Sequence, residues 1–196
     1  MPPPTPPARI VASAGRLRRA ARLAERALAV AGAVFLVWHG GLGVSEVVSG
    51  SMAPTLRGDG AGNPANDWVF YETVSTRLVA PPRFHFLVFE SDEGVPIVKR
   101  VVAGEGEAVS IKDGDLAVDG LVRGAPEGVR YLRAGHLRAT PEGSASYVVP
   151  PGSAFVLGDD SQDSWDSRFT GGVPRERWIG RPVAVVWPPA RWRWLW

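Results

Sequence analysis

The chain of 196 residues contains no cysteine and only three histidines. The absence of cysteine excludes disulfide bonds, thiol catalysis and thiolate metal sites. None of the histidines is well placed to be a catalytic base, because His39 lies in an apolar stretch, His85 alternates with phenylalanines, and His136 lies in an arginine-rich segment. Zinc motifs such as HExxH are also missing, so we predict no metal and no other cofactor.

Lysine is nearly absent as well, because 20 of the 22 basic residues are arginine and only Lys99 and Lys112 remain. Lys112 stands in a turn sequence, which predicts a solvated side chain. Lys99 stands inside an apolar run, residues 97–102. Burial there would lower the pKa of Lys99 and allow it to act as a general base, whereas an arginine cannot lose its proton. The alternative is an exposed lysine on the polar face of a half-buried strand.

Acidic residues are scarce at the start of the chain, where residues 1–26 carry six arginines and one acid, Glu25. This Pro-rich and basic segment has a net charge of +5, so the +2 of the whole chain leaves −3 for residues 27–196. Such a distribution argues against a nucleic-acid-binding surface. By the positive-inside rule it predicts a cytoplasmic N-terminus, with everything after Val44 outside the membrane.

An apolar stretch, residues 27–44, follows the basic segment and predicts a single N-terminal transmembrane helix. Such a helix would be roughly 27 Å long, slightly less than the ~30 Å hydrocarbon core of a bilayer. The competing interpretation is a cleavable signal peptide that ends near Ser45, because small residues precede that position. The length of the basic segment favours a retained anchor.

Residues 45–196 have no convincing helical periodicity and are rich in short β-branched or aromatic runs bounded by turn residues. They predict a mainly β domain of packed or coiled antiparallel sheets. Asp119-Gly120 is a hairpin signal, and residues 124–143 resemble a polar insertion with little core. The expected strands are residues 68–74, 84–90, 97–102, 116–122, 146–149, 154–157 and 182–187.

Ser51 follows the apolar stretch by seven residues, in the run Ser49-Gly50-Ser51-Met52. A serine so close to a bilayer suggests a nucleophile whose substrate lies in or on the membrane. A serine nucleophile needs a partner that accepts its proton, and Lys99 is the remaining candidate once the histidines are set aside. The G-x-S-x-G pattern of the α/β hydrolases is absent around Ser51.

Three segments in this order resemble the conserved boxes of bacterial type I signal peptidases: SGSMAPTL from Ser49, VKRVV from Val98, and GDDSQDSWDSR from Gly158. The resemblance extends from residue 49 to residue 187. Members of that family are membrane-anchored Ser-Lys endopeptidases that remove signal peptides from exported preproteins. The resemblance therefore implies a signal-peptidase fold and a place in the bacterial cytoplasmic membrane, with one membrane crossing and the catalytic domain on the outer side.

The resemblance also implies roles for individual side chains. Ser51 would be the nucleophile and Lys99 the general base. The oxyanion hole would be formed by the backbone N–H of Ser51 and the hydroxyl of Ser49, and Ser164 would orient the lysine. Asp159, Asp166 and Arg168 would form a structural charge network around the site.

The sequence departs from the family pattern at Asp160, where asparagine is usual, at Ala103, where glycine is usual, and at Glu107, where aspartate is usual. These departures remove no group that the mechanism needs. Asp159, Ser161 and Asp163 also imitate the opening of a calcium loop, but the sixth and twelfth positions of that motif do not match.

The substrates implied are preproteins with small residues at the first and third positions before the cut, bound as an extended segment along a sheet edge. Met52 and the strand 84–89 are candidates for lining the pockets. The lipid bilayer is a second expected partner, because Trp187, Trp192, Trp194 and Trp196 alternate with arginines in a mixture typical of membrane interfaces. The alternative for these tryptophans is burial in the core.

Two other functions remain open. A self-cleaving repressor-type Ser-Lys protease has the same pair of residues, but would carry a DNA-binding helical domain in place of the basic and apolar segments. A non-catalytic, membrane-tethered β module would have no need of a lysine in an apolar strand.

Overall fold

The structure is a computed structural model that describes residues 8–112, 114–129, 131 and 146–195, without the side chains of residues 8–18, 36–39 and 112. The chain divides into two compact units, residues 1–41 and residues 42–196.

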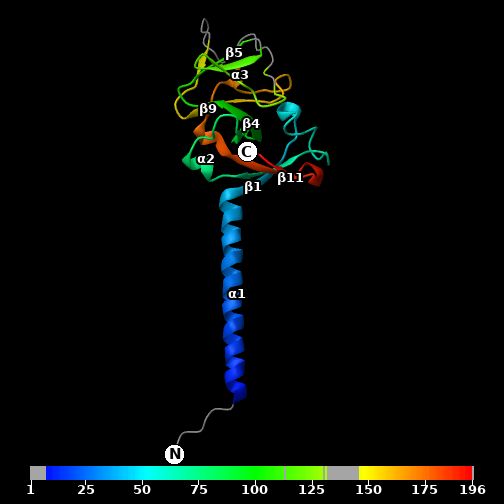
Figure 1. Cartoon of the computed structure of the whole chain (residues 1–196), viewed down its shortest axis with the longest axis vertical. Coiled ribbons are helices and arrows are strands. Elements are labelled where there is room, and N and C mark those ends of the chain that lie inside the picture. Colours follow the sequence, from blue (N-terminus) through cyan, green and yellow to red (C-terminus); the bar gives the residue numbers. More distant parts are fainter. Residues whose placement is uncertain (1–7, 113, 130, 132–145, 196) are drawn as a thin grey trace, which may run out of the picture. The chain divides into compact units, whose positions relative to one another are not determined.

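In the first unit the described residues form one helix, α1 (Ala8–Gly41), that includes residues 8–26 of the basic segment and most of the apolar stretch (Figure 1). Apolar side chains on different sides of it, including Leu28, Val30 and Val34, are more than 60% exposed. Within the described part of the chain, no helix is both long enough and apolar enough to cross a membrane. The predicted end of the anchor is wrong, because the helix stops at Gly41 and residues 42–44 belong to a strand.

The second unit is mainly antiparallel β, as predicted, and its larger sheet contains the strands on which the site is built (Figure 1). These strands are β1 (Leu42–Glu46), β2 (Trp68–Glu72), β3 (Phe86–Glu90), β4 (Pro96–Ala103), β9 (Ser153–Leu157), β10 (Val173–Pro174), β11 (Trp178–Trp187) and β12 (Arg193–Trp194). Their order among the described residues is β1-β2-β11-β3-β4-β9-β10, and β12 pairs with β11 beside this path.

The smaller sheet has the order β7-β6-β5-β8 among the described residues. Its strands are β5 (Ala108–Lys112), β6 (Asp115–Val118), β7 (Leu121–Arg123) and β8 (Tyr147–Val148). Asp119 and Gly120 join β6 to β7, and both have positive φ, at 52° and 73°. Two consecutive left-handed residues are the requirement of a type I′ turn, so the predicted hairpin is confirmed.

The helices of this unit are short: α2 (Ser75–Leu78), α3 (Ser167–Thr170) and the 3-10 turns η1 (Gly50–Met52), η2 (Arg175–Arg177) and η3 (Pro189–Arg191). Each of the predicted runs contains a strand, and the run 116–122 is divided between β6 and β7 by the hairpin. Strands β1, β5, β10 and β12 were not predicted.

The apolar core is arranged in three clusters that hold the sheets in place. One cluster lies where β4 and β9 meet the smaller sheet, and it includes Phe155 and Leu157. Val129 and Tyr131 are buried in the same cluster, so the prediction of an insertion with little core is wrong for these two residues. Residues 124–128 of the insertion are mostly exposed, whereas residue 130 and residues 132–143 lie outside the described residues.

Candidate active site

Ser51 lies in η1, directly after the segment that follows β1, and is 7% exposed. Its position is set by its neighbours, because Met52 and Leu56 are fully buried in the core cluster that also contains Val47. Met52 therefore packs into the core and lines neither cavity beside Ser51, so the prediction that it lines a pocket is wrong. Gly58 allows its own segment to pack closely against the backbone before Ser51, because a Cβ at Gly58 would lie within about 2.6 Å of backbone atoms of residues 47 and 49.

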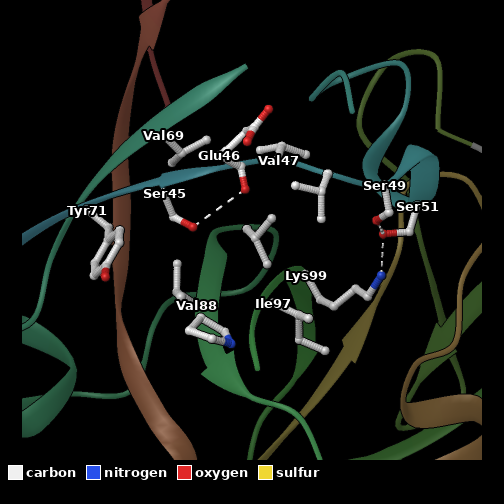
Figure 2. Close-up of a pocket in the computed structure, with 13 residues that line it drawn as sticks. Ser45, Glu46, Val47, Ser49, Ser51, Val69, Tyr71, Val88, Ile97 and Lys99 are labelled. Carbon is white, nitrogen blue, oxygen red and sulfur yellow. Dashed lines mark hydrogen bonds between the residues drawn. The ribbon is translucent and has the colours of Figure 1, made fainter. Parts of the chain in front are cut away.

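Lys99 lies in β4 opposite Leu87 of β3, and its side chain extends to Ser51 (Figure 2). The Nζ atom donates a hydrogen bond of 2.5 Å to the Oγ of Ser51. Lys99 is 4% exposed, so the interpretation of an exposed strand lysine is wrong. Burial is the main cause that lowers the pKa of Lys99 to about 8, and the carboxylate of Asp166 partly opposes it. An amine with this pKa is neutral in a usable fraction of molecules near neutral pH.

Ser49 lies beside Ser51, with its Oγ 3.1 Å from the Oγ of Ser51 (Figure 2). Its backbone is extended, with φ −132° and ψ 154°, and η1 begins at the next residue. Gly50 separates the two serines. A Cβ built on Gly50 would lie 2.9 Å from a carboxylate oxygen of Asp163. The hydroxyl of Ser51 therefore lies within hydrogen-bond distance of both the hydroxyl of Ser49 and the amine of Lys99.

Ser164 is buried, but its Oγ donates to Asp166 at 2.7 Å. Among the described residues it makes no hydrogen bond to Lys99. It does lie next to the backbone of Ser51, because a Cβ at Gly158 would meet both the Oγ of Ser164 and the carbonyl oxygen of Ser51. The structure thus brings Ser164 to the site, with Asp166 as its direct partner.

Asp166 organises the loop that carries Ser164. Its carboxylate accepts hydrogen bonds from the backbone N–H of Gly158 at 2.9 Å and from the guanidinium of Arg168 at 2.8 Å and 3.0 Å. Arg168 also donates to the carbonyl oxygen of Ser161. Both members of the pair are nearly fully buried, so the loop is held by a neutral ion pair.

A second buried ion pair involves the start of the same loop. The guanidinium of Arg100 donates to Asp159 at 2.7 Å and 2.5 Å, and the hydroxyl of Thr55 donates to the same carboxylate. Arg100 follows Lys99 in β4, so its side chain points to the opposite face of the strand. The backbone N–H of Asp160 donates to the carbonyl oxygen of Ser51 at 3.1 Å, which ties this loop directly to η1.

The other departures from the family pattern have ordinary surroundings. Ala103 is buried in the core cluster of β4 and β9. Glu107 forms an ion pair with Arg83 and accepts a hydrogen bond from the N–H of Gly104. Neither residue lines a cavity beside Ser51.

Two cavities meet at the serine and the lysine. The smaller, about 70 Å³, is lined by apolar side chains that include Val47, Val69 and Val88 (Figure 2). The larger, about 580 Å³, is lined by Phe89 and by the loop after β9. Of the predicted strand 84–89, one residue therefore faces each cavity. Ser49, Ser51, Ile97 and Lys99 line both cavities.

Beside these cavities, none of the described strands pairs with one edge of β4 over residues 96–99. Residues 96–99 pair with β3, whereas pairing with β9 begins only at Arg100. Unpaired backbone groups on this stretch can accept an extended peptide as an additional strand. Among the described residues, no three side chains of the kinds that bind metals lie together.

A serine hydroxyl that accepts a hydrogen bond from a buried lysine of lowered pKa is the arrangement that a serine hydrolase with a lysine base would need. Residues 20–187 match the family model described as "Signal peptidase, peptidase S26". The chain belongs to this signal peptidase family.

Individual relatives agree with the family match. The chain is 32% identical to signal peptidase I of Leptolyngbya laminosa, over 74% of this chain and 68% of that one. It is 30% identical to the probable signal peptidase I-2 of Synechocystis sp., over 74% of this chain and 63% of that one, so it spans about two thirds of each relative. A solved signal peptidase I from Enterococcus faecalis V583 aligns with a TM-score of 0.44 and 30% identity, over 53% of this chain and 97% of that one.

Proposed function

We propose that the chain is a membrane-attached serine endopeptidase that removes N-terminal signal peptides from exported preproteins. The observation that supports this most directly is the 2.5 Å hydrogen bond between the Nζ of buried Lys99 and the Oγ of Ser51. Membership of the signal peptidase family supports the choice of substrate.

In the proposed mechanism, neutral Lys99 accepts the hydroxyl proton of Ser51 as the Oγ attacks the carbonyl carbon before the cut. The oxyanion is bound by the N–H of Ser51 and the hydroxyl of Ser49, a kind of donor typically worth about 3 kcal/mol in the transition state. Lys99 then gives the proton to the leaving nitrogen, and the peptide bond breaks. A water then attacks the acyl-enzyme as it transfers a proton to Lys99, and Lys99 returns that proton to the Oγ of Ser51 as the ester bond breaks.

Ser164 is proposed as a positioning residue that acts through Asp166. Its hydrogen bond to Asp166 holds that carboxylate in the direction from which it attracts the ammonium of Lys99. Asp159, Asp166 and Arg168 are proposed to keep the loop in place and to have no role in bond cleavage.

The small cavity supports a preference for small side chains before the cut, because about 70 Å³ accommodates a few methyl groups and no large side chain. The free edge of β4 would hold the extended substrate, so alternate side chains would point to the same side. This is consistent with small residues at the first and third positions.

The test is cleavage of an exported preprotein with an Ala-x-Ala segment by the detergent-solubilised full chain. We expect wild type to cut after that segment and Ser51→Ala to be inactive. Lys99→Arg keeps the charge but cannot accept a proton, so it should also be inactive. Lys112→Arg, the same change at the only other lysine, should cleave like wild type. An active Lys99→Arg enzyme would rule out the lysine base.

The same assay distinguishes the alternatives. A repressor-type protease would cut its own chain at a defined bond and leave the preprotein intact. A non-catalytic module would cut neither protein. Mass spectrometry of both polypeptides after incubation identifies which of the three outcomes occurs.

We further propose that the protein is attached to the bacterial cytoplasmic membrane through α1, with the basic end in the cytoplasm and the β unit outside. The exposed apolar side chains on different sides of α1 support a lipid environment, and the six arginines of residues 1–26 support the orientation. The apolar helix from residue 27 to residue 41 is roughly 22 Å long. Protease accessibility of each end in sealed vesicles tests the orientation, and equal protection of both ends would contradict it.

The C-terminal tryptophans are proposed to touch the same bilayer. Trp187, Trp192 and Trp194 are 48%, 56% and 50% exposed, so burial in the core is the wrong interpretation for these three, while Trp196 lies outside the described residues. Deletion of residues 191–196 would remove these tryptophans but would also damage the fold, because Leu195 is buried and Arg191 forms an ion pair with the buried Asp67.

Point substitutions therefore give the cleaner experiment. Trp192→Ser should weaken binding of the protein to liposomes. Trp165→Ser, which changes an exposed tryptophan beside the larger cavity, should not. Equal binding by the two variants would remove the C-terminal contact from the proposal.

A further inference from the structure

The larger cavity extends from Ser51 to a wall that differs from the rest of the site. One side is the end of β3 and the turn that leads into β4, including Phe89 and Glu93. The other side is the loop after β9 and the residues that follow α3, including Asp163 and Trp165. Trp165 stacks on Phe169, with ring centroids 4.4 Å apart, and forms an apolar wall. The cavity thus combines an apolar lining with a rim of carboxylates.

The position of this cavity relative to the cut follows from the smaller one. Both cavities are lined by Ser49, Ser51 and Lys99, so the bond to be broken lies at their junction. The small apolar cavity suits the small side chain before the cut, which leaves the larger cavity for the residues after it. Its volume of about 580 Å³ is enough for several side chains.

The charges around the larger cavity do not cancel. Asp92 is paired with Arg177 at 2.6 Å, and Asp166 is paired with Arg168 at 2.8 Å. Glu93 and Asp163 also line the cavity, and neither forms an ion pair with another described residue. Asp163 lies at the inner end, because its carboxylate is the nearest group to a Cβ built on Gly50. Glu93 lies on the exposed turn between β3 and β4.

We propose that the larger cavity binds the first residues after the cut and that Glu93 and Asp163 make it favour basic and disfavour acidic side chains there. The proposal rests on the proposed peptidase function, because it assigns one half of that cleft. It predicts selection among preproteins by the start of the mature chain, in addition to selection by the signal peptide.

The test uses peptide substrates that differ only in the second residue after the cut, which is lysine, serine or glutamate. For each enzyme the quantity measured is the ratio of kcat/KM for the lysine substrate to that for the glutamate substrate. Any change that Asp163→Asn causes in the acidity of Lys99 affects both substrates and cancels in this ratio. A second series carries the same three residues five positions before the cut.

For wild type we expect a ratio of about ten at low salt, with each carboxylate contributing about threefold. Asp163→Asn and Glu93→Gln should each lower the ratio to about three, and the double variant should bring it close to one. Asp115→Asn, the same change on the smaller sheet and away from both cavities, should leave it at the wild-type value. Raising the salt to 0.5 M should reduce the wild-type ratio, because the charges are exposed to solvent.

A wild-type ratio near one, or a ratio that the double variant retains, would overturn the subsite while leaving the peptidase function in place. If the variants lose discrimination only in the series with charges before the cut, the cavity binds residues before the cut, and the proposal is overturned as well. Glu93→Gln keeps the test decisive if Asp163→Asn fails to fold, because Glu93 is on an exposed turn. If wild type cuts none of the peptides and no preprotein, the proposed function fails first.

Discussion

Replacement of Lys99 by methionine is expected to stabilise the protein while abolishing catalysis. Lys99 is 4% exposed, and burial lowers its pKa from 10.5 to about 8. At 1.36 kcal/mol for each pKa unit, this difference means that the folded state loses about 3 kcal/mol at pH 7 by holding the charged lysine. Methionine has a similar length and no charge, so Lys99→Met removes this cost.

The hydrogen bond to Ser51 reduces the net gain. Loss of that bond costs about 1 kcal/mol, so Lys99→Met should be more stable than wild type by about 2 kcal/mol at pH 7. Ser51→Ala is the matched control, because it removes the hydrogen bond and retains the amine.

The difference between Lys99→Met and wild type should depend on pH in a defined direction. Between about pH 8 and pH 10.5 the unfolded lysine binds more protons than the folded one, so the stability of wild type rises with pH. The methionine variant lacks this contribution. The difference in unfolding free energy should therefore change by about 2.5 kcal/mol in favour of wild type between pH 7 and pH 10.

Urea unfolding of the full chain in a non-denaturing detergent, followed by tryptophan fluorescence, measures these free energies at each pH. The eight tryptophans of the chain supply the signal. A methionine variant less stable than wild type at pH 7, or a difference that stays constant up to pH 10, would refute the reasoning. Either result would mean that the buried amine is compensated in the folded protein.

Three further outcomes follow from the geometry of the site. The rate of preprotein cleavage should rise through about pH 8 as Lys99 loses its proton, and a rate that is flat from pH 6 to pH 9 would contradict a lysine base. Asp163→Asn should shift this rise to lower pH, because the carboxylate of Asp163 raises the pKa of Lys99. A plot of kcat/KM against pH gives the midpoint of the rise. A midpoint at higher pH than in wild type would contradict this prediction. Gly158→Ala should lower the rate of preprotein cleavage at least tenfold and lower the free energy of unfolding by about 1–3 kcal/mol, because the new Cβ would displace Ser164. Gly124 has open space around it, so Gly124→Ala should match wild type in both the cleavage rate and the free energy of unfolding.

Much of the β fold could be predicted from the sequence, because strands such as β3 and β4 bury β-branched and aromatic side chains and are bounded by turn residues. β1 was missed because its residues continue the apolar stretch and look like the end of a helix. β5 contains a readable alternation, Val109-Ser110-Ile111, so a signal for it was present. β12 has only two residues and depends on β11 for its pairing.

The site was predicted less completely than the fold. Lysine is so rare in the chain that only two candidates remained, and the apolar run around Lys99 together with the serine motif selected it. The hydrogen bond from Ser164 to Asp166 could not be inferred, because two residues in one turn can face in different directions. The electrostatic effect of Asp163 on the site depends on its approach to Gly50, which lies more than 100 positions earlier in the chain. No local sequence pattern predicts a contact between residues so far apart in the chain.

The pairing of charges explains how Lys99 can lie near several carboxylates and still lose its proton near pH 8. Burial lowers the pKa of Lys99 most, Asp166 raises it, and Arg168 lowers it again. Because Asp166 and Arg168 form a neutral pair, their effects on the lysine largely oppose each other, and the effect of burial remains. A loop of the same shape with an unpaired Asp166 would raise the pKa of Lys99. The buried arginine therefore contributes to the acidity of the lysine as well as to the shape of the loop.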